Sequence, residues 1–180
     1  MVVGRRGRVV TRRVQPGGAA PLDGERAASA DAAHAAALRL LTTRARTRAE
    51  LRQRLAERGF EDAAVTETLA RLERVGLVDD AALADTVAES RAERGLDAPA
   101  IAAELRDRGV DPAVAERAAQ AAVPAEDRAD RCRQVAQARL AQLAGLPAPT
   151  QLRRLATYLA RRGYPPDLAE TVARDLVVPD

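Results

Sequence analysis

The sequence has no lysine, asparagine or tryptophan, and it has only one cysteine, one histidine and three aromatic residues. A single cysteine, Cys132, excludes an internal disulfide framework and a cysteine-rich zinc site. A single histidine, His34, excludes a histidine-cluster metal site and argues against a histidine-based catalytic triad. Without lysine, the Gly-Lys-Ser/Thr phosphate loop of ATPases cannot form. We therefore expect no catalytic residues, no cofactor and no metal site, and a protein that is not an enzyme.

Three residue types dominate the 180 positions, with 42 alanines, 20 leucines and 29 arginines. Alanine, leucine and arginine are good helix formers, and β-branched and aromatic residues are too few for a sandwich, a barrel or a doubly wound sheet. No apolar run approaches the roughly 18 residues of a membrane-spanning helix. The N-terminus lacks the apolar segment of a secretory signal. The composition predicts an all-α protein in the cytoplasm, with no membrane segment.

The charge is distributed unevenly along the chain. Residues 1–60 contain 13 arginines and 5 acidic residues, whereas residues 61–180 contain 16 arginines and 21 acidic residues. Such an asymmetry indicates a basic end that faces a polyanion or an acidic protein surface. Residues 1–30 lack helical periodicity and are interrupted by glycine and proline, so we predict a flexible basic tail there. The alternative is that this tail is basic without having a partner.

Helix start and stop signals follow one another closely from about Asp31. Thr47-Arg-Ala-Glu50 has the pattern of a capping box, and we predict Thr150 as the N-cap of a later helix. Asp79 or Asp80 is predicted to cap a helix rather than to form a catalytic pair, because no pocket or second partner is visible. Glycines are expected to end helices in the left-handed conformation, each followed by an apolar residue such as Leu77. The predicted helix-ending glycines are Gly59, Gly76, Gly95, Gly109 and Gly163.

One pattern occurs three times: two apolar residues four apart, then an arginine, a glycine and another apolar residue. The glycines of the three copies are 50 and 54 residues apart. A pattern with such a period predicts tandem helical repeats, with about nine helices in units 31–78, 79–123 and 124–180. The alternative is a globular helical bundle. The three copies are Leu51 to Phe60, Ile101 to Val110 and Leu155 to Tyr164.

Three stretches also carry a resemblance to a known family. Residues 37–51 read Ala-Leu-Arg-Leu-Leu-Thr-Thr-Arg-Ala-Arg-Thr-Arg-Ala-Glu-Leu, and residues 76–84 contain a Gly-Leu-Val-Asp-Asp turn. Residues 91–110 combine Arg-Ala-Glu-Arg-Gly with Ile-Ala-Ala-Glu-Leu-Arg-Asp-Arg-Gly-Val. In this order and spacing the three stretches resemble the RecX proteins, which regulate the RecA recombinase. The family usually has an aromatic residue at the position of Leu83.

The resemblance implies both a fold and a function. The implied fold is an elongated, curved array of three tandem three-helix repeats. RecX-like proteins bind RecA and its filament on single-stranded DNA, lodge in the filament groove and inhibit strand exchange and ATP hydrolysis. They block extension of the RecA filament or promote its disassembly, and so affect DNA repair, recombination and the SOS response. We therefore expect the RecA filament as partner, single-stranded DNA as a second candidate partner, and a monomer.

A dense run of arginines covers the first inter-helix turn and the second predicted helix. Arginine has a planar fork of donors that suits carboxylates and phosphates, and Arg48, Arg52 and, with drift, Arg58 are expected along one side of the helix. Two interpretations stay open: a contact surface, or a solvated face without a partner. The alternative function is a helical nucleic-acid-binding module that acts on DNA directly. The candidate RecA or DNA contacts are Arg44, Arg46, Arg48, Arg52, Arg54, Arg58 and Arg91.

Overall fold

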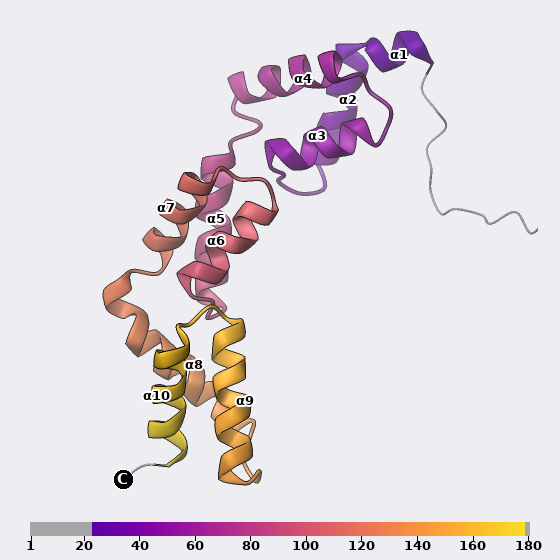
Figure 1. The fold of residues 1–180 in the computed structure, drawn as a ribbon. Coiled ribbons are helices and arrows are strands. Elements are labelled where there is room, and N and C mark those ends of the chain that lie inside the picture. The colour runs from indigo at the N-terminus through magenta and orange to yellow at the C-terminus, as the bar shows by residue number, and fades with distance from the viewer. Residues whose placement is uncertain (1–22, 179–180) are drawn as a thin grey trace, which may run out of the picture.

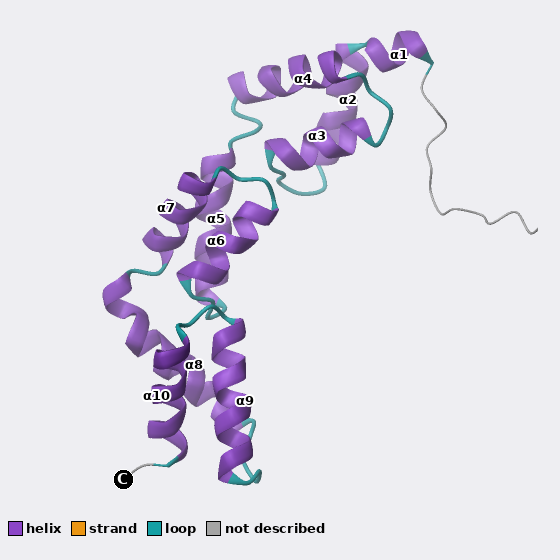
Figure 2. Ribbon diagram, in the orientation of Figure 1, coloured by secondary structure: helices purple, strands orange, loops and turns teal. Residues whose placement is uncertain are grey.

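The computed structural model describes residues 23–178, and in this range every regular element is a helix (Figure 2). Figure 1 shows the helices in three groups, α1–α4, α5–α7 and α8–α10, which follow one another along a curved, elongated array. The predicted all-α repeat array is therefore confirmed. The elements are α1 (Gly24–Ala28), α2 (Ala30–Leu41), α3 (Arg48–Ala56), α4 (Asp62–Arg74), α5 (Asp80–Glu93), α6 (Ala98–Asp107), α7 (Pro112–Ala122), a 3-10 turn η1 (Ala125–Asp127), α8 (Arg128–Ala141), α9 (Ala148–Arg161) and α10 (Pro166–Val177).

Each group of helices encloses its own hydrophobic cluster. Leu51 and Leu55 of α3 are fully buried in the first cluster, as are Ile101 and Leu105 of α6 in the second. The third cluster contains Leu155 and Leu159 of α9 together with Tyr164 and Cys132. Most other members are alanines and valines, whose small side chains let the helices pack closely. Because burial of apolar surface is the main stabilising term, each unit contributes its own share of stability.

Several helix ends have the geometry that their sequences predict. Thr47 accepts a hydrogen bond from the Glu50 N–H at 3.0 Å, and Glu50 accepts one from the Thr47 N–H at 3.2 Å, which confirms the capping box. Gly59 has a φ of +87°, and the N–H of Phe60 donates to the carbonyl of Leu55. The other positive-φ glycines of the described residues are Gly76, Gly95, Gly109, Gly145 and Gly163.

The first and second units meet where the start of α3 lies against the end of α6. The Thr47 hydroxyl donates to the carbonyl of Arg108 at 2.7 Å, and the Arg108 Nε lies 3.0 Å from Glu50 Oε1. A Cβ on Gly109, which has a φ of +81°, would overlap with the Cβ of Ala49. Only glycine therefore fits at this point of close approach.

The second and third units meet in the same manner. The N–H of Asp97 donates to the carbonyl of Arg162 at 2.8 Å, and a Cβ on Gly163 would lie 2.7 Å from the Cβ of Ala100. The Asp97 carboxylate is fully buried and pairs with the Arg128 Nε at 3.0 Å, although Asp97 occupies the N-cap position of α6. The recurring Arg-Gly pair therefore contacts the preceding unit. Arg108-Gly109 packs against the first turn of α3, and Arg162-Gly163 packs against the first turn of α6.

Two expectations need correction. The predicted tail of residues 1–30 is helical from Gly24 onward, because the Asp23 side chain accepts the Arg26 N–H at 2.8 Å and the buried Ala27 accepts the N–H of Glu61 through its carbonyl. Residues 1–22 lie outside the described residues. Thr150 is not an N-cap, since α9 begins at Ala148 after Pro147. In the part of the chain that the structure describes, no helix has the length and apolarity to cross a membrane.

Candidate protein and nucleic-acid interface

The run of arginines between residues 44 and 58 is divided between two faces. Arg48 pairs with Glu73 through an Nε–Oε1 distance of 2.7 Å, and Arg52 lies 3.2 Å from Asp62 and 3.1 Å from Thr66. All three partners belong to α4. Arg48 and Arg52 thus hold α3 against α4, and their charges are matched by carboxylates. Both side chains are still about two-fifths exposed, at 41% for Arg48 and 42% for Arg52, so a contact between these residues and a partner stays a prediction.

The remaining arginines of the run lie in the loop before α3, on α3 and in the turn after it, and one of them, Arg54, pairs with Glu57 at 3.0 Å. The pKa of Arg46 is lowered by burial and by the positive charges of Arg44, Arg54 and Arg58, while Glu50 opposes this shift. Arg44 is 53% exposed and lies 3.5 Å from Glu50, a carboxylate that Arg108 already holds. Among the described residues Arg58 forms no salt bridge. We call Arg44, Arg46, Arg54 and Arg58 the α3 arginine cluster.

Arg91 has a partner inside the second unit. Its Nε and Nη2 lie 2.7 and 2.6 Å from the two carboxylate oxygens of Glu104, a bidentate pair that joins α5 to α6. The hydrogen bond and the charge of each partner raise the pKa of Arg91 and lower that of Glu104. The geometry therefore gives Arg91 a structural task.

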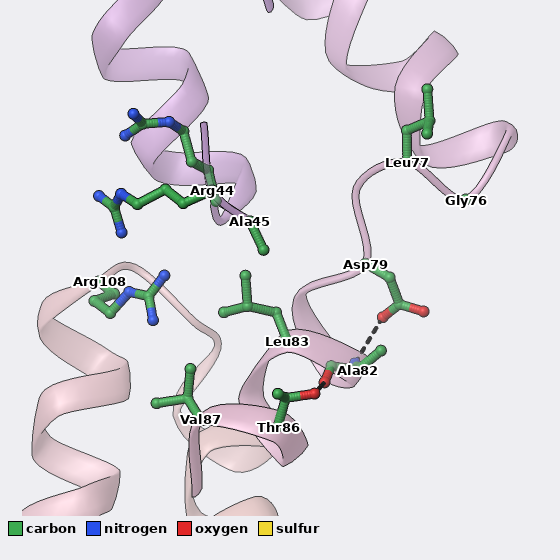
Figure 3. A pocket seen from close by; sticks show the side chains of 11 residues that line it. Arg44, Ala45, Gly76, Leu77, Asp79, Ala82, Leu83, Thr86, Val87 and Arg108 are labelled. Atoms are coloured by element: carbon green, nitrogen blue, oxygen red, sulfur yellow. Dashed lines mark hydrogen bonds between the residues drawn. The ribbon is translucent and has the colours of Figure 1, made fainter. Parts of the chain in front are cut away.

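A cavity of about 460 Å³ lies beside the α3 arginine cluster. It is located where the first and second units meet, which we call the first joint. Figure 3 shows Leu83 and Val87 of α5 pointing into it, with the guanidinium groups of Arg44 and Arg108 on one side. Leu77 lies across the cavity and is 52% exposed, although its N–H donates to the Leu72 carbonyl at the end of α4. A second cavity of about 300 Å³ shares the residues Arg44, Arg46 and Arg108. The joint thus combines an apolar hollow with an arginine rim.

The two aspartates at the start of α5 cap two different helices. Asp79 accepts hydrogen bonds from the N–H groups of Ala81 and Ala82 at 3.0 and 2.9 Å, inside its own unit. Asp80 accepts the N–H of Arg48 at 2.8 Å and so caps α3 of the first unit. Burial raises the pKa of Asp80, and the Arg48 N–H opposes this shift. These are structural tasks that differ from those of a catalytic acid pair.

A second basic surface escaped the sequence reasoning. Arg153, Arg154 and Arg161 of α9 and Arg139 of α8 line a cavity of about 280 Å³ with Thr157 and Tyr158. The sequence contained a signal for this surface, because the segment that forms α9 has several arginines and no acidic residue. Within residues 23–178, no three His, Cys, Asp or Glu side chains lie close enough to hold a metal ion.

Comparison with family models relates this geometry to known proteins. Residues 33–72 match the first three-helix domain of RecX, and residues 125–172 match the third three-helix domain of RecX. A regulatory protein RecX from Amycolatopsis mediterranei is 43% identical over 137 residues, which covers 76% of this chain and 78% of the relative. One from Thermobifida fusca is 44% identical over 144 residues, which covers 79% of this chain and 77% of the relative.

Solved structures show the same fold at lower identity. The crystal structure of RecX from Lactobacillus salivarius superimposes with a TM-score of 0.68 at 18% identity, over 82% of this chain and 96% of that chain. A further crystal structure of a regulatory protein RecX gives a TM-score of 0.67 at 19% identity, over 79% of this chain and 70% of that chain. The sequence matches extend over most of the repeat array, and the structures share its architecture, so this chain belongs to the RecX family.

Proposed function

We propose that this protein is a non-catalytic regulator that binds the RecA recombinase and its filament on single-stranded DNA. By binding, it inhibits strand exchange and ATP hydrolysis, and so acts on DNA repair, recombination and the SOS response in the cytoplasm. The observation that carries this proposal is the match to regulatory proteins RecX over about three quarters of the chain. An elongated repeat array supports it, because such an array offers a long contact surface without a catalytic pocket.

The first joint has the features of a protein-binding surface. Protein interfaces combine a buried apolar centre with a polar rim, and arginine is enriched among the residues that contribute most affinity. Leu77, Leu83 and Val87 supply the apolar part here, and Arg44 supplies an exposed guanidinium beside it. The fork of arginine pairs well with carboxylates. We assign this cavity and the α3 arginine cluster to an acidic surface of RecA, bound by a monomer of the regulator.

The direct test measures RecA activity with the purified regulator added in increasing amounts. We expect DNA-dependent ATP hydrolysis and strand exchange to fall as the regulator approaches stoichiometric amounts with RecA. Bovine serum albumin at the same concentrations serves as the control for non-specific effects. If both activities stay unchanged at a stoichiometric excess of folded regulator, the proposal is wrong.

The alternative, a module that acts on DNA without RecA, predicts a different dependence on salt. A protein held mainly by phosphates loses affinity steeply as salt is raised, because binding releases condensed counterions. Binding should therefore be measured on DNA alone and on RecA–DNA filaments over the same salt series. Inhibition that persists at salt concentrations where free DNA is no longer bound supports the RecA-directed function.

A further inference from the structure

The basic surface of the third unit is built by two helices around one tyrosine. Arg153, Arg154 and Arg161 belong to α9, and Arg139 reaches the same cavity from α8. Residues three or four apart lie on one side of a helix, which places the α9 arginines over two successive turns, about 12 Å in length. We call these four arginines with Tyr158 the α9 patch.

The positive charge of the α9 patch is not balanced locally. α9 is the only α-helix in the described part of the chain that has no aspartate or glutamate. Within residues 23–178 none of the four arginines forms a salt bridge, and no carboxylate lines the cavity. Arg48 and Arg52, in contrast, are each matched by an acidic residue of α4. Four like charges held together favour an anionic ligand that offers several negative charges.

Contacts with Tyr158 hold part of the patch in place before any ligand binds. The Cζ of Arg139 lies 5.0 Å from the centre of the Tyr158 ring, and that of Arg162 lies 4.5 Å from it. These are cation–π contacts, which restrict the guanidinium groups without neutralising them. Arg139 also donates from Nη1 to Gln142 Oε1 at 2.5 Å, which further fixes its orientation. The exposed side chains of Arg153, Arg154 and Arg161 form no salt bridge among the described residues, so their donors remain available to a ligand beside the restrained Arg139.

The composition of the patch distinguishes between two kinds of partner. A protein partner needs an apolar centre, such as the one at the first joint. The α9 patch has no aliphatic side chain in its lining, and arginines contact the ring of its one aromatic residue. Interfaces with nucleic acids are more polar and much more positively charged than those between proteins. The patch therefore fits phosphates better than an acidic protein surface.

We propose that the α9 patch binds the phosphodiester backbone of a nucleic acid. Along one DNA strand the charges repeat about every 3.4 Å, so a basic surface of about 12 Å spans several phosphates. The guanidinium forks bind phosphate oxygens in pairs and contact no base, so binding is independent of sequence. This assignment goes beyond the proposed function, because it does not require RecA. It places the nucleic-acid contact in the unit at the other end of the array from the first joint (Figure 1).

The experiment is a direct binding titration without RecA. A fluorescently labelled dT oligomer and a DNA duplex of equal length are titrated with full-length protein over a salt series, using anisotropy. The test variant is Arg154→Glu/Arg161→Glu, and the matched control is Arg74→Glu/Arg117→Glu, which makes the same charge change at exposed positions of α4 and α7. Circular dichroism checks that both variants keep their helix content.

We expect the test variant to bind at least about 10-fold more weakly and to show a salt slope lower by about 2, since each lost phosphate contact removes about one unit. The control should change affinity by less than about 3-fold, through overall charge alone. The ratio of single-strand to duplex affinity identifies which source of phosphate the patch prefers. Equal losses in both variants, or no DNA binding by the parent protein at low salt, would overturn the proposal.

A competitor separates phosphate from carboxylate. Unlabelled DNA should displace the labelled oligomer at far lower concentrations than polyglutamate of the same total charge. If polyglutamate competes equally well, the patch is a site for an acidic protein and the proposal is wrong. The DNA titration contains no RecA, so its result is independent of the proposed function. The proposed function is tested by RecA inhibition, which is measured separately with the same variants.

Discussion

Gly109 packs its backbone directly against the side chain of Ala49, so that the end of α6 in the second unit touches the first turn of α3 in the first. Gly163 repeats this contact against Ala100 at the next joint. Gly59 is the corresponding residue of the first unit, and no atom of the described residues lies within 4 Å of a Cβ placed there. The same sequence pattern therefore packs against a neighbouring unit at Gly109 and Gly163, but has no such neighbour among the described residues at Gly59.

Replacing these glycines separates backbone strain from joint packing. Gly59→Ala and Gly109→Ala both force a side chain into a positive φ, which costs about 1–2 kcal/mol. Gly109→Ala must also displace Ala49, and overpacking adds about 1–3 kcal/mol. Urea unfolding should therefore show a larger loss of stability for Gly109→Ala than for Gly59→Ala. Equal losses would mean that the units are not closely packed at this joint.

The Glu50–Arg108 pair should make stability depend on pH. Burial raises the pKa of Glu50, but the hydrogen bond and charge of Arg108 outweigh it and hold the pKa below its usual value. A lowered pKa means that the stabilisation is present at neutral pH and is lost as the pH falls through the folded-state pKa. Arg108→Gln should cost about 2 kcal/mol at pH 7, and less as the pH falls below about 4.

The exposed pair Arg106–Glu116, with a separation of 3.8 Å, provides the control for this measurement. Arg106→Gln should cost less than about 1 kcal/mol, because exposed pairs contribute little. Urea unfolding of both variants between pH 3 and pH 7 gives the comparison. A loss for Arg108→Gln that stays constant over this range would contradict the assignment.

Asp80 should tolerate the loss of its charge but not of its oxygen. Asp80→Ala removes the acceptor for the Arg48 N–H and should cost about 1 kcal/mol, as for other N-cap residues. Asp80→Asn keeps an acceptor and removes a charge that burial disfavours, since burial raises the pKa of Asp80. Its unfolding midpoint at pH 7 should stay close to that of the parent. If Asn proves as destabilising as Ala, the oxygen is not the important feature.

Cys132 should be unreactive in the folded protein. Its side chain is fully buried, and burial, helped by the negative charge of Asp97, raises its pKa to about 11. Because the thiolate is the reactive form, Ellman's reagent at pH 8 should label the native protein far more slowly than the urea-unfolded protein. Equally rapid labelling in both states would show that α8 opens readily.

The two sides of the arginine run should respond differently to changes of charge, if the proposed function holds. Arg44→Gln/Arg58→Glu removes one exposed positive charge and reverses another without placing a carboxylate beside Glu50, so it should weaken RecA inhibition with little change in the unfolding midpoint. Arg48→Glu/Arg52→Glu should lower the midpoint, because it places new carboxylates beside Glu73 and Asp62. Inhibition and urea unfolding are measured on both variants. A loss of inhibition confined to the second pair would reverse the assignment of the contact face.

Local signals in the sequence were enough to place most helix ends. The Thr47–Glu50 capping box depends on residues close together in the chain, and so does the left-handed turn at Gly59. Short-range hydrogen bonds and backbone sterics produce both features, which is why a linear pattern reveals them. Thr150 was misplaced because Pro147 already allows the chain to enter α9 one turn earlier.

The candidate site was only partly predictable. The sequence alone located a dense group of arginines, but it did not distinguish Arg48, which pairs with Glu73, from Arg44, which is half exposed. That distinction depends on α4, whose acidic residues reach α3 only after the two helices pack. The α9 patch is the converse case, since its importance lies in the absence of such partners around it.

The sequence by itself determined that this protein is helical, repetitive and poor in histidine and cysteine, because composition, caps and periodicity are local properties of the chain. Only the tertiary structure decided what each copy of the pattern does. Arg58-Gly59 and Arg108-Gly109 are the same local motif, but only the second meets the first turn of another unit's helix. The physical reason is that charge pairing and close backbone contact depend on neighbours that packing brings together from distant parts of the chain.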